Sequence, residues 1–398
     1  RQQAAERELV RSDGARQYAG IQGDASVGIE WPSAPMRAYD SVTVRVRVSG
    51  RDGSESGWSD PVVYRTGPLS GADWHADFIR AADDAGDDDF GVTRFRREFV
   101  VAEGLQRALL SYTAQGAVVL EVDGRRVDDE ELAPGWTQYD KRLAFSTVDV
   151  SQELAPGRHV LAATVGAGWF AERYGFNGQL VRTWHGPRAL SSQLRLEYSD
   201  GEVATMTSDD TWSASLDGPT RRSSIYLGEA HDARLEDSWA VPGGIFRGGA
   251  LAVVCVGGHG DLVPADRPPI RVIESLTPVT VHDRPEGPIL DFGQNVVGRL
   301  RVRVRGAAGS EITLRHAEVL EGGELCLRLL RLADSTDTYV LAGNPAGEEW
   351  APRFTYHGFR YAQVSGIAVE QLEVTAEVMH SDVKRIGWLE TGNVAIDK

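Results

Sequence analysis

Alternation of apolar and polar residues marks the first strands that the sequence predicts. Residues 42–48 read VTVRVRV, a strict period of two, and the polar, glycine-containing stretch GRDGSESG follows at 50–57. Such alternation is typical of a half-buried strand, and the polar stretch is typical of a turn. A second short strand, VVYRTG, is predicted at 62–67. We therefore expect a small antiparallel sandwich over residues 1–67, and residues 2–12 fit either a helix or a strand.

Two aspartate–glycine pairs predict hairpins in the next segment. Residues 118–127 read VVLEV-DG-RRV, where Asp123-Gly124 suits the two positive φ angles of a type I′ turn. The stretch LEYSDGEVATM at 196–206 repeats this pattern with Asp200-Gly201. Little helical periodicity separates these strands, so we expect a jelly-roll-like β-sandwich over residues 70–262.

Prolines predict a second boundary, because Pro264, Pro268 and Pro269 disfavour both a helix and a central strand. Alternation resumes beyond them at 299–306, 310–320 and 337–343. We therefore expect another β-sandwich over residues 268–380, followed by a connecting segment at 381–398. The predicted fold class is all-β, built from tandem β-sandwiches.

Charge and cysteine content narrow the function classes. The 398 residues include 58 acidic and 42 basic side chains, and the formal charge of −16 disfavours binding to nucleic acid or to an anionic membrane. Two cysteines, Cys255 and Cys326, are too few for a disulfide framework or a zinc quartet, which favours buried free thiols. No apolar run is long enough to span a bilayer, and no signal-like segment follows Arg1. The compartment is therefore open, with the cytoplasm slightly favoured over secretion.

Two pairs of acidic residues have the side-chain chemistry of a glycosidase acid and base. The candidates are Glu229 with Asp232 and Glu318 with Glu321, but residues three apart in a strand point to opposite faces. A local ion pair between Asp232 and Arg234 is the simpler expectation for the first pair. The sequence also lacks the glycine-rich, zincin and GxSxG motifs. We expect no catalytic residue among these pairs.

An aromatic loop at 168–184, GWFAERYGFNGQLVRTW, has the composition of a sugar-binding surface, because flat rings stack on the apolar faces of pyranoses. The alternative is that these rings fill a sandwich core. The candidate sugar-binding residues are Trp169, Glu172, Arg173, Tyr174, Asn177, Trp184 and Trp136. No cofactor is expected to be required. Calcium is a candidate ligand of the acidic run at 128–131, for which a solvated acidic turn is the alternative.

The Trp58-Ser59-Asp60-Pro61 stretch resembles the end of a fibronectin type III module.

Several other stretches together resemble the bacterial α-L-rhamnosidases of glycoside hydrolase family 78. The rhamnosidase-like stretches are DW-x-A-x-FI (73–79), LAPGWTQYDKRL (132–143), GAGWF (166–170), YLGEAHDAR (226–234), DFGQNVVG (291–298), RHAEVL (315–320) and PRFTYHGFRYAQVSG (352–366). Their order and spacing cover residues 40 to 380, so the chain is identified as a member of this family.

The resemblance implies that residues 268–380 form a concanavalin-like sandwich and that residues 381–398 lead towards an (α/α)6 barrel absent from this chain. In this family that barrel carries the catalytic acid and base, which act with inversion. The implied function is an accessory segment, inactive alone, of an enzyme that hydrolyses terminal α-L-rhamnosyl residues. The implied partners are a rhamnose-containing glycoside or oligosaccharide, the catalytic barrel and, as in many relatives, a second copy in a homodimer. The alternative is a stand-alone carbohydrate-binding or cell-surface module.

Overall fold

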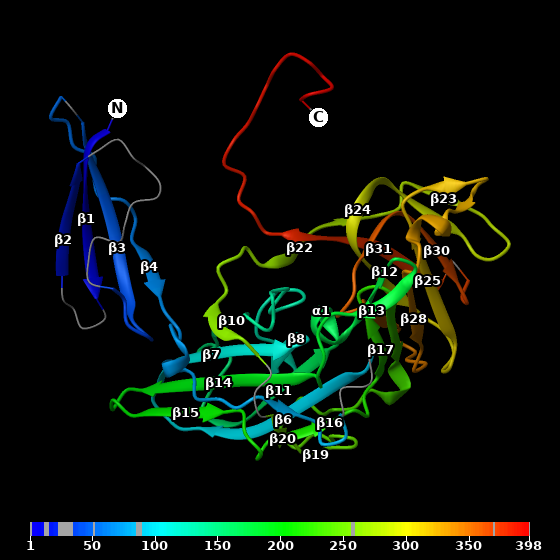
Figure 1. The fold of residues 1–398 in the computed structure, drawn as a ribbon, viewed down its shortest axis with the longest axis horizontal. Helices are drawn as coiled ribbons and strands as arrows, with labels where there is room; N and C mark the ends of the chain where they lie inside the picture. The colour runs from blue at the N-terminus through cyan, green and yellow to red at the C-terminus, as the bar shows by residue number, and fades with distance from the viewer. Residues whose placement is uncertain are drawn as a thin grey trace. The chain divides into compact units, whose positions relative to one another are not determined.

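The computed structural model describes residues 2–11, 16–22, 35–50, 52–84, 90–255, 259–368 and 371–397. These residues are mainly β-strands, as the alternating patterns predict (Figure 1). They divide into two compact units, of which the first comprises residues 1–75 with 261–264 and the second comprises 76–260 with 265–398. The all-β prediction is confirmed, and no helix among the described residues is long and apolar enough to cross a membrane.

The first unit contains an antiparallel sheet in the order β2-β1-β3-β4. The strands are β1 (Gln2–Arg11), β2 (Arg16–Gln22), β3 (Ser41–Gly50) and β4 (Val62–Arg65), and β21 (Asp261–Pro264) belongs to the same unit. The strands predicted at 42–48 and 62–67 are therefore confirmed, and the undecided stretch at 2–12 is a strand. Leu9, Val42 and Val44 form its small core. A 3-10 turn, η1 (Gly71–Asp73), follows, with Ser70 as its N-cap.

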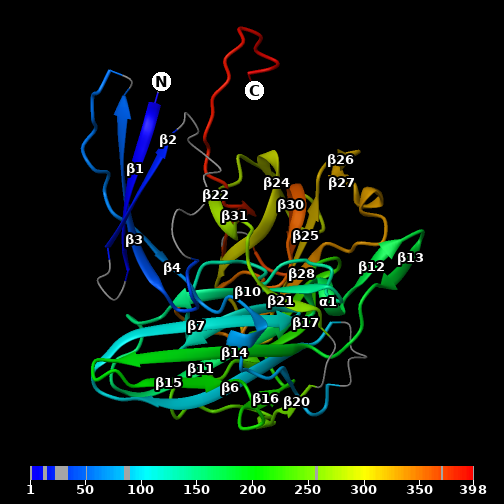
Figure 2. The same cartoon turned by 60° about the vertical axis from the view of Figure 1, so that its left-hand side comes forward.

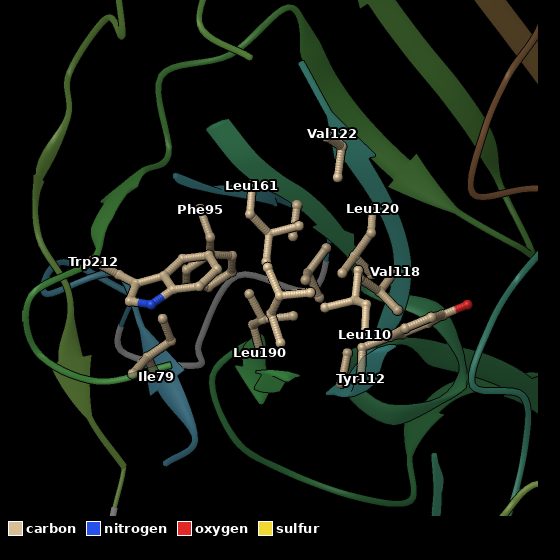
Figure 3. Close-up of a cluster of buried hydrophobic side chains, with 14 of the residues drawn as sticks. Ile79, Phe95, Leu110, Tyr112, Val118, Leu120, Val122, Leu161, Leu190 and Trp212 are labelled. Atoms are coloured by element: carbon tan, nitrogen blue, oxygen red, sulfur yellow. The ribbon is translucent and has the colours of Figure 1, made fainter. Parts of the chain in front are cut away.

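The second sandwich begins the larger unit and has two sheets. One runs β20-β5-β14-β7-β10 with β15 paired to β14, and the other runs β19-β16-β6-β11-β8-β9. Their bounds are β5 (Ile79–Arg80), β6 (Val92–Val101), β7 (Leu105–Gln115), β8 (Ala117–Val122), β9 (Arg125–Arg126), β10 (Arg142–Asp149), β11 (Gly157–Gly166), β14 (Ala189–Tyr198), β15 (Val203–Thr207), β16 (Ser213–Ser215), β19 (Ala250–Leu251) and β20 (Val253–Val254). Buried side chains from both sheets meet between them, among them Leu110, Leu161, Leu190 and Trp212 (Figure 3).

The two predicted hairpins form, but with different turns. Asp123 and Gly124 have φ angles of 50° and 77° and join β8 to β9, which confirms the type I′ turn. Between β14 and β15, only Gly201 takes a positive φ angle, of 88°. The expectation of the same turn at Asp200-Gly201 was therefore wrong. Asp200 instead accepts a hydrogen bond from the Glu202 amide, which favours a longer turn that needs a single left-handed glycine.

The third sandwich contains a large sheet in the order β17-β18-β28-β25-β30-β24-β31-β22, with β23 and β29 paired to β24. Its strands are β17 (Thr220–Ser224), β18 (Gly228–Asp232), β22 (Ile270–Leu276), β23 (Thr280–His282), β24 (Ile289–Val304), β25 (Glu311–Ala317), β28 (Thr336–Val340), β29 (Glu348–Trp350), β30 (His357–Ser365) and β31 (Leu372–Ser381). A separate hairpin joins β26 (Leu320–Glu321) to β27 (Glu324–Leu325), and η3 (Leu327–Leu330) follows. The predicted strands at 299–306, 310–320 and 337–343 all lie in this region.

Strands β17 and β18 come from within the interval 70–262 but pair with the sheet of the third sandwich. β18 runs parallel to β28, so Ala230 lies opposite Thr338. The predicted interval 70–262 assigns both strands to the second sandwich. The spacing of strands along the chain does not identify the sheet that each strand joins. A 3-10 turn, η2 (Ala233–Leu235), then returns the chain to the second sandwich. The segment that forms the second sandwich thus contributes two strands to the third sandwich, in addition to packing against it.

A buried arginine lies where the second and third sandwiches meet. Arg299 in β24 donates hydrogen bonds to Glu131 at 3.0 and 3.2 Å, to Glu377 at 2.7 Å and to the Pro352 carbonyl at 2.8 Å. All three charged side chains are almost fully buried. Burial alone would raise the pKa of Glu377, but the guanidinium of Arg299 holds that pKa below its ordinary value. The junction therefore contains a fully paired ionic network.

Two further features complete the fold. Cys326 is buried, as predicted, whereas Cys255 is only half-buried, so the expectation of a buried thiol was wrong for Cys255.

After β31, residues 382–397 form no strand or helix, and both views show them extending away from the sheets of the larger unit (Figures 1 and 2).

We expect Arg299→Ala to lower the free energy of unfolding by about 1.5–3 kcal/mol, because Glu131 and Glu377 lose the buried cation that they share and keep only their half-exposed partners Arg126 and Arg301. Arg303→Ala is the matched control. Arg303 lies in the same strand and pairs with Glu349 at 2.7 Å, but its side chain is 66% exposed, so solvent screens the pair and we expect a much smaller loss. Urea unfolding monitored by tryptophan fluorescence would measure both. Equal losses would contradict the importance of the buried network.

Candidate functional site

An aromatic cluster lies around the short helix α1 (Gly168–Ala171), near the hairpin of β12 (Arg173–Phe176) and β13 (Gln179–Arg182). The Trp184 ring meets Tyr139 edge-on at 4.9 Å between centroids, and Trp136 lies 6.3 Å from Trp184. Tyr139 is buried, but Trp136 is 64% exposed. Trp136 is thus an exposed ring beside the half-buried Trp184, which a buried tyrosine supports, and an exposed ring of this kind suits stacking on a sugar.

Glu172 is the most constrained of the predicted sugar-binding residues. It is 1% exposed, and its carboxylate accepts hydrogen bonds from the Ser224 hydroxyl and from the amides of Ile225 and Tyr226, both at 2.8 Å. Burial raises the pKa of Glu172 to about 7, although these hydrogen bonds favour its charged form. Glu172 therefore fixes the residue 224–226 turn of the third sandwich against α1, and its oxygens already have protein partners.

Three of the other predicted residues lie on or beside the β12–β13 hairpin, which projects away from the sheets (Figure 2). Asn177 and Gly178 have φ angles of 50° and 76° and form its turn, a hairpin signal that the sequence analysis did not use. Arg173 is exposed and lies opposite Arg182. The Tyr174 hydroxyl donates to the Gly168 carbonyl at 3.3 Å, which ties the hairpin to α1.

Trp169 points towards the third sandwich. Its ring lies 6.4 Å from that of Tyr356, and it packs on a buried cluster that includes Phe354 and Met379. The structure therefore separates the predicted set. Trp136 is exposed beside the half-buried Trp184, Trp169 and Glu172 face the junction, and Asn177 forms the hairpin turn.

The acidic run proposed for calcium divides among separate partners. Asp128 accepts from the Tyr112 hydroxyl, Asp129 pairs with Arg271 at 2.6 Å and Glu130 pairs with Arg267 at 2.7 Å. Glu131 belongs to the Arg299 network. The four carboxylates thus diverge, which is the arrangement of a set of structural ion pairs rather than a shared cation cage.

The carboxylate pairs considered from the sequence also have separate partners. Asp232 pairs with Arg234 at 2.8 Å, as predicted. Glu318 accepts from Asn295 at 3.0 Å, and Glu321 pairs with Arg328 at 3.0 Å.

Glu229 is a second buried carboxylate at the junction. It is fully buried, and its Oε2 accepts hydrogen bonds at 3.0 Å from the amides of Arg353 and Phe354. Burial raises the pKa of Glu229 to about 7 as well. Sequence reasoning gave Glu229 no such role, because its partners lie more than 120 residues along the chain. Both carboxylates with a pKa near neutrality are therefore held by backbone amides inside the protein.

A buried group of His316, Asp337 and His357 lies within the third sandwich, and it is the one group among the described residues with the composition and closeness of a metal site. His357 Nε2 lies 3.0 Å from Asp337 Oδ2, and the two imidazole rings stack at 4.2 Å. Burial lowers the pKa of His316 to about 3, so that ring is neutral. His357 is buried as well, and its hydrogen bond to Asp337 gives one ring nitrogen a partner inside the protein.

A cavity of about 220 Å³ is lined by residues of the second and third sandwiches, including Glu121, His231, Trp239 and Arg353. Arg353 pairs with Glu121 across the junction at 3.1 Å. The lining includes none of the seven predicted sugar-binding residues.

Comparison with known proteins assigns all three β regions of the chain. Residues 1–70 match the Rha78A-like N-terminal immunoglobulin domain, residues 103–274 match the α-L-rhamnosidase N-terminal domain, and residues 282–380 match the bacterial α-L-rhamnosidase concanavalin-like domain. The class is therefore a tandem β-domain protein with the domain order of the rhamnosidases. The chain belongs to the bacterial α-L-rhamnosidase family, of which it carries the N-terminal β domains.

Individual α-L-rhamnosidases are also similar to most of this chain. An α-L-rhamnosidase of Streptomyces avermitilis is 39% identical over 77% of this chain and 30% of its own length, and one of Alteromonas sp. is 29% identical over 95% and 42%. The crystal structure of the Aspergillus terreus α-L-rhamnosidase superposes with a TM-score of 0.93 at 36% identity, covering 100% of this chain and 47% of that one. The Streptomyces avermitilis enzyme complexed with L-rhamnose shares the fold, with a TM-score of 0.89 at 24% identity over 96% of this chain and 54% of that one. The chain spans less than half the length of the curated relatives named here.

We expect the titration of Glu172 to affect stability between its unfolded pKa, near 4.3, and its folded pKa of about 7. Across that window the folded protein binds more protons than the unfolded chain, so the stabilising contribution is complete below the window and is lost as the pH rises through 7. Glu172→Gln should therefore show a smaller decline in unfolding free energy from about pH 5 to 7.5.

Urea unfolding at several pH values would measure this change. Glu153→Gln serves as the control, because Glu153 is exposed in the same sandwich and its removal should leave the pH dependence unchanged. A decline in Glu172→Gln as steep as in the wild type would contradict the prediction.

Proposed function

We propose that this chain is the N-terminal accessory portion of an α-L-rhamnosidase that hydrolyses terminal α-L-rhamnosyl residues from glycosides with inversion, its catalytic carboxylates lying outside this chain. The observation that carries the proposal is the match of each β domain to an N-terminal or concanavalin-like rhamnosidase domain. In this arrangement the β domains support a separate catalytic domain, for which an (α/α)6 barrel is the expected architecture.

The buried carboxylates Glu172 and Glu229 are consistent with catalytic carboxylates that lie outside this chain. An inverting glycosidase needs an acid that reaches the glycosidic oxygen and a base about 6.5–9.5 Å away that activates water. Glu172 and Glu229 have a suitable pKa near 7, but both are buried and bonded to backbone amides. Neither can approach a sugar without breaking those bonds. Their chemistry therefore favours a structural role at the sandwich junction.

The segment after β31 also supports an adjoining domain. Its large apolar side chains are exposed, with Ile386 at 88% and Trp388 at 75%. Val383, Leu389, Val394 and Ile396 are exposed as well. Contiguous apolar groups of this kind are typical of a surface that another protein element covers.

We expect the chain alone to release no 4-nitrophenol from 4-nitrophenyl α-L-rhamnopyranoside. A longer protein that joins these β domains to an (α/α)6 domain should hydrolyse it, and proton NMR should detect β-L-rhamnose as the first product, because inversion exchanges the anomeric configuration. Turnover by the chain alone would place catalytic groups within it. Initial formation of the α-anomer would contradict inversion.

A stand-alone carbohydrate-binding module is the second candidate, favoured by the exposed Trp136 beside Trp184. In that case Trp136→Ala should weaken binding of an aryl α-L-rhamnoside by about two- to tenfold, since stacking on an aromatic ring contributes about 0.5–1.5 kcal/mol. Trp388→Ala is the control, because it removes an exposed tryptophan elsewhere in the chain. Isothermal calorimetry with and without calcium would measure both variants. Flat titrations of the wild type would exclude this second function.

A further inference from the structure

The buried group of His316, Asp337 and His357 comes from three neighbouring strands. His316 lies in β25, Asp337 in β28 and His357 in β30, and β25 pairs with both of the other strands. All three residues are buried, His316 and Asp337 completely. One donor atom from each residue lies within 4.8 Å of the others. The sheet register thus gathers two imidazoles and a carboxylate at one interior point.

The hydrogen bonds of His316 leave an electron pair without a partner. Nδ1 lies 2.9 Å from the Ser335 carbonyl oxygen, which can only accept, so Nδ1 carries the proton and Nε2 has a free lone pair. Nε2 is buried and has no hydrogen-bond partner among the described residues. It lies 4.0 Å from Asp337 Oδ2, a second electron-pair donor. Two such donors facing each other inside a protein favour a cation between them.

The surrounding contacts orient the group as outer contacts orient metal ligands. The Ser335 carbonyl fixes the tautomer and the ring position of His316. Asp337 Oδ1 accepts the Glu229 amide proton at 2.8 Å, which leaves Oδ2 directed at the histidines. The ligand atoms are therefore fixed by backbone groups of two different segments.

We propose that His316, Asp337 and His357 bind a single Zn²⁺ ion that links strands β25, β28 and β30. Two imidazole nitrogens and one carboxylate oxygen are a common zinc ligand set, and tetrahedral coordination separates its ligand atoms by about 3.3 Å. The observed spacings of 3.0 Å between His357 and Asp337 and 4.0 Å between His316 and Asp337 bracket this value. Binding through Nε2 requires His357 to carry its proton on Nδ1, so the proton that Nε2 shares with Asp337 moves to the other ring nitrogen. Because the group is buried, the ion serves stability and enters as the protein folds.

The test is the metal content and cobalt spectrum of the full chain. Protein produced in zinc-supplemented medium should contain one equivalent of zinc by plasma mass spectrometry, and growth in cobalt should give the visible d–d absorption of a tetrahedral Co²⁺ site. Unfolding in urea with a chelator and refolding without metal should lower Tm by several degrees, and refolding with Zn²⁺ should restore it.

His316→Gln and Asp337→Asn should lose the zinc and the cobalt absorption while retaining a β-type circular dichroism spectrum. His380→Gln is the matched control, because His380 is exposed outside the group and its removal should leave one equivalent bound. Folded wild type without stoichiometric zinc or cobalt overturns the proposal, as does unchanged metal content in folded His316→Gln and Asp337→Asn. If both variants fail to fold, the wild-type metal content, cobalt spectrum and zinc-dependent Tm decide the matter alone.

Discussion

Burying charge at the junction of the second and third sandwiches is the constraint on which the larger unit depends. Arg299 can remain inside because Glu131 and Glu377 neutralise it and the Pro352 carbonyl accepts a further hydrogen bond from its guanidinium. Glu172, beside α1, also accepts hydrogen bonds across this junction, from amides of the 224–226 turn of the third sandwich. Glu229 accepts amide hydrogen bonds within the third sandwich. The contacts of Arg299 and Glu172 are directional, so they specify how the two sandwiches meet more sharply than apolar packing alone.

The same constraint accounts for the path of the chain, in which two strands from the segment of the second sandwich join the sheet of the third. Strands β17 and β18 leave the second sandwich, join β28 of the third and return through η2. Glu229 lies in β18 and binds the turn that precedes β30, while Glu172 binds the turn between β17 and β18. Buried carboxylates thus fix the turn end of the exchanged β17–β18 pair. The second and third sandwiches therefore share strands and are not independent modules on a flexible linker.

Two sandwiches that share strands are consistent with the accessory role proposed here. Glu172 and Glu229, the carboxylates with a pKa near 7, are used for internal bonding, and several large apolar side chains of the segment after β31 are exposed. In the second sandwich, the exposed Trp136 beside the half-buried Trp184 is an aromatic surface open to a ligand.

The sequence by itself determined the strands, several turns and the family. Alternation at 42–48 and 299–306 identifies strands because a pleated strand has a period of two, and Asp123-Gly124 identifies a turn because its backbone angles depend on those two residues. These features are local. The sheet that β17 joins, the amide partners of Glu172 and the approach of His316 to His357 join residues dozens of positions apart. Only the tertiary structure decided them, because side-chain partners across strands depend on sheet order and register, which a local pattern does not encode.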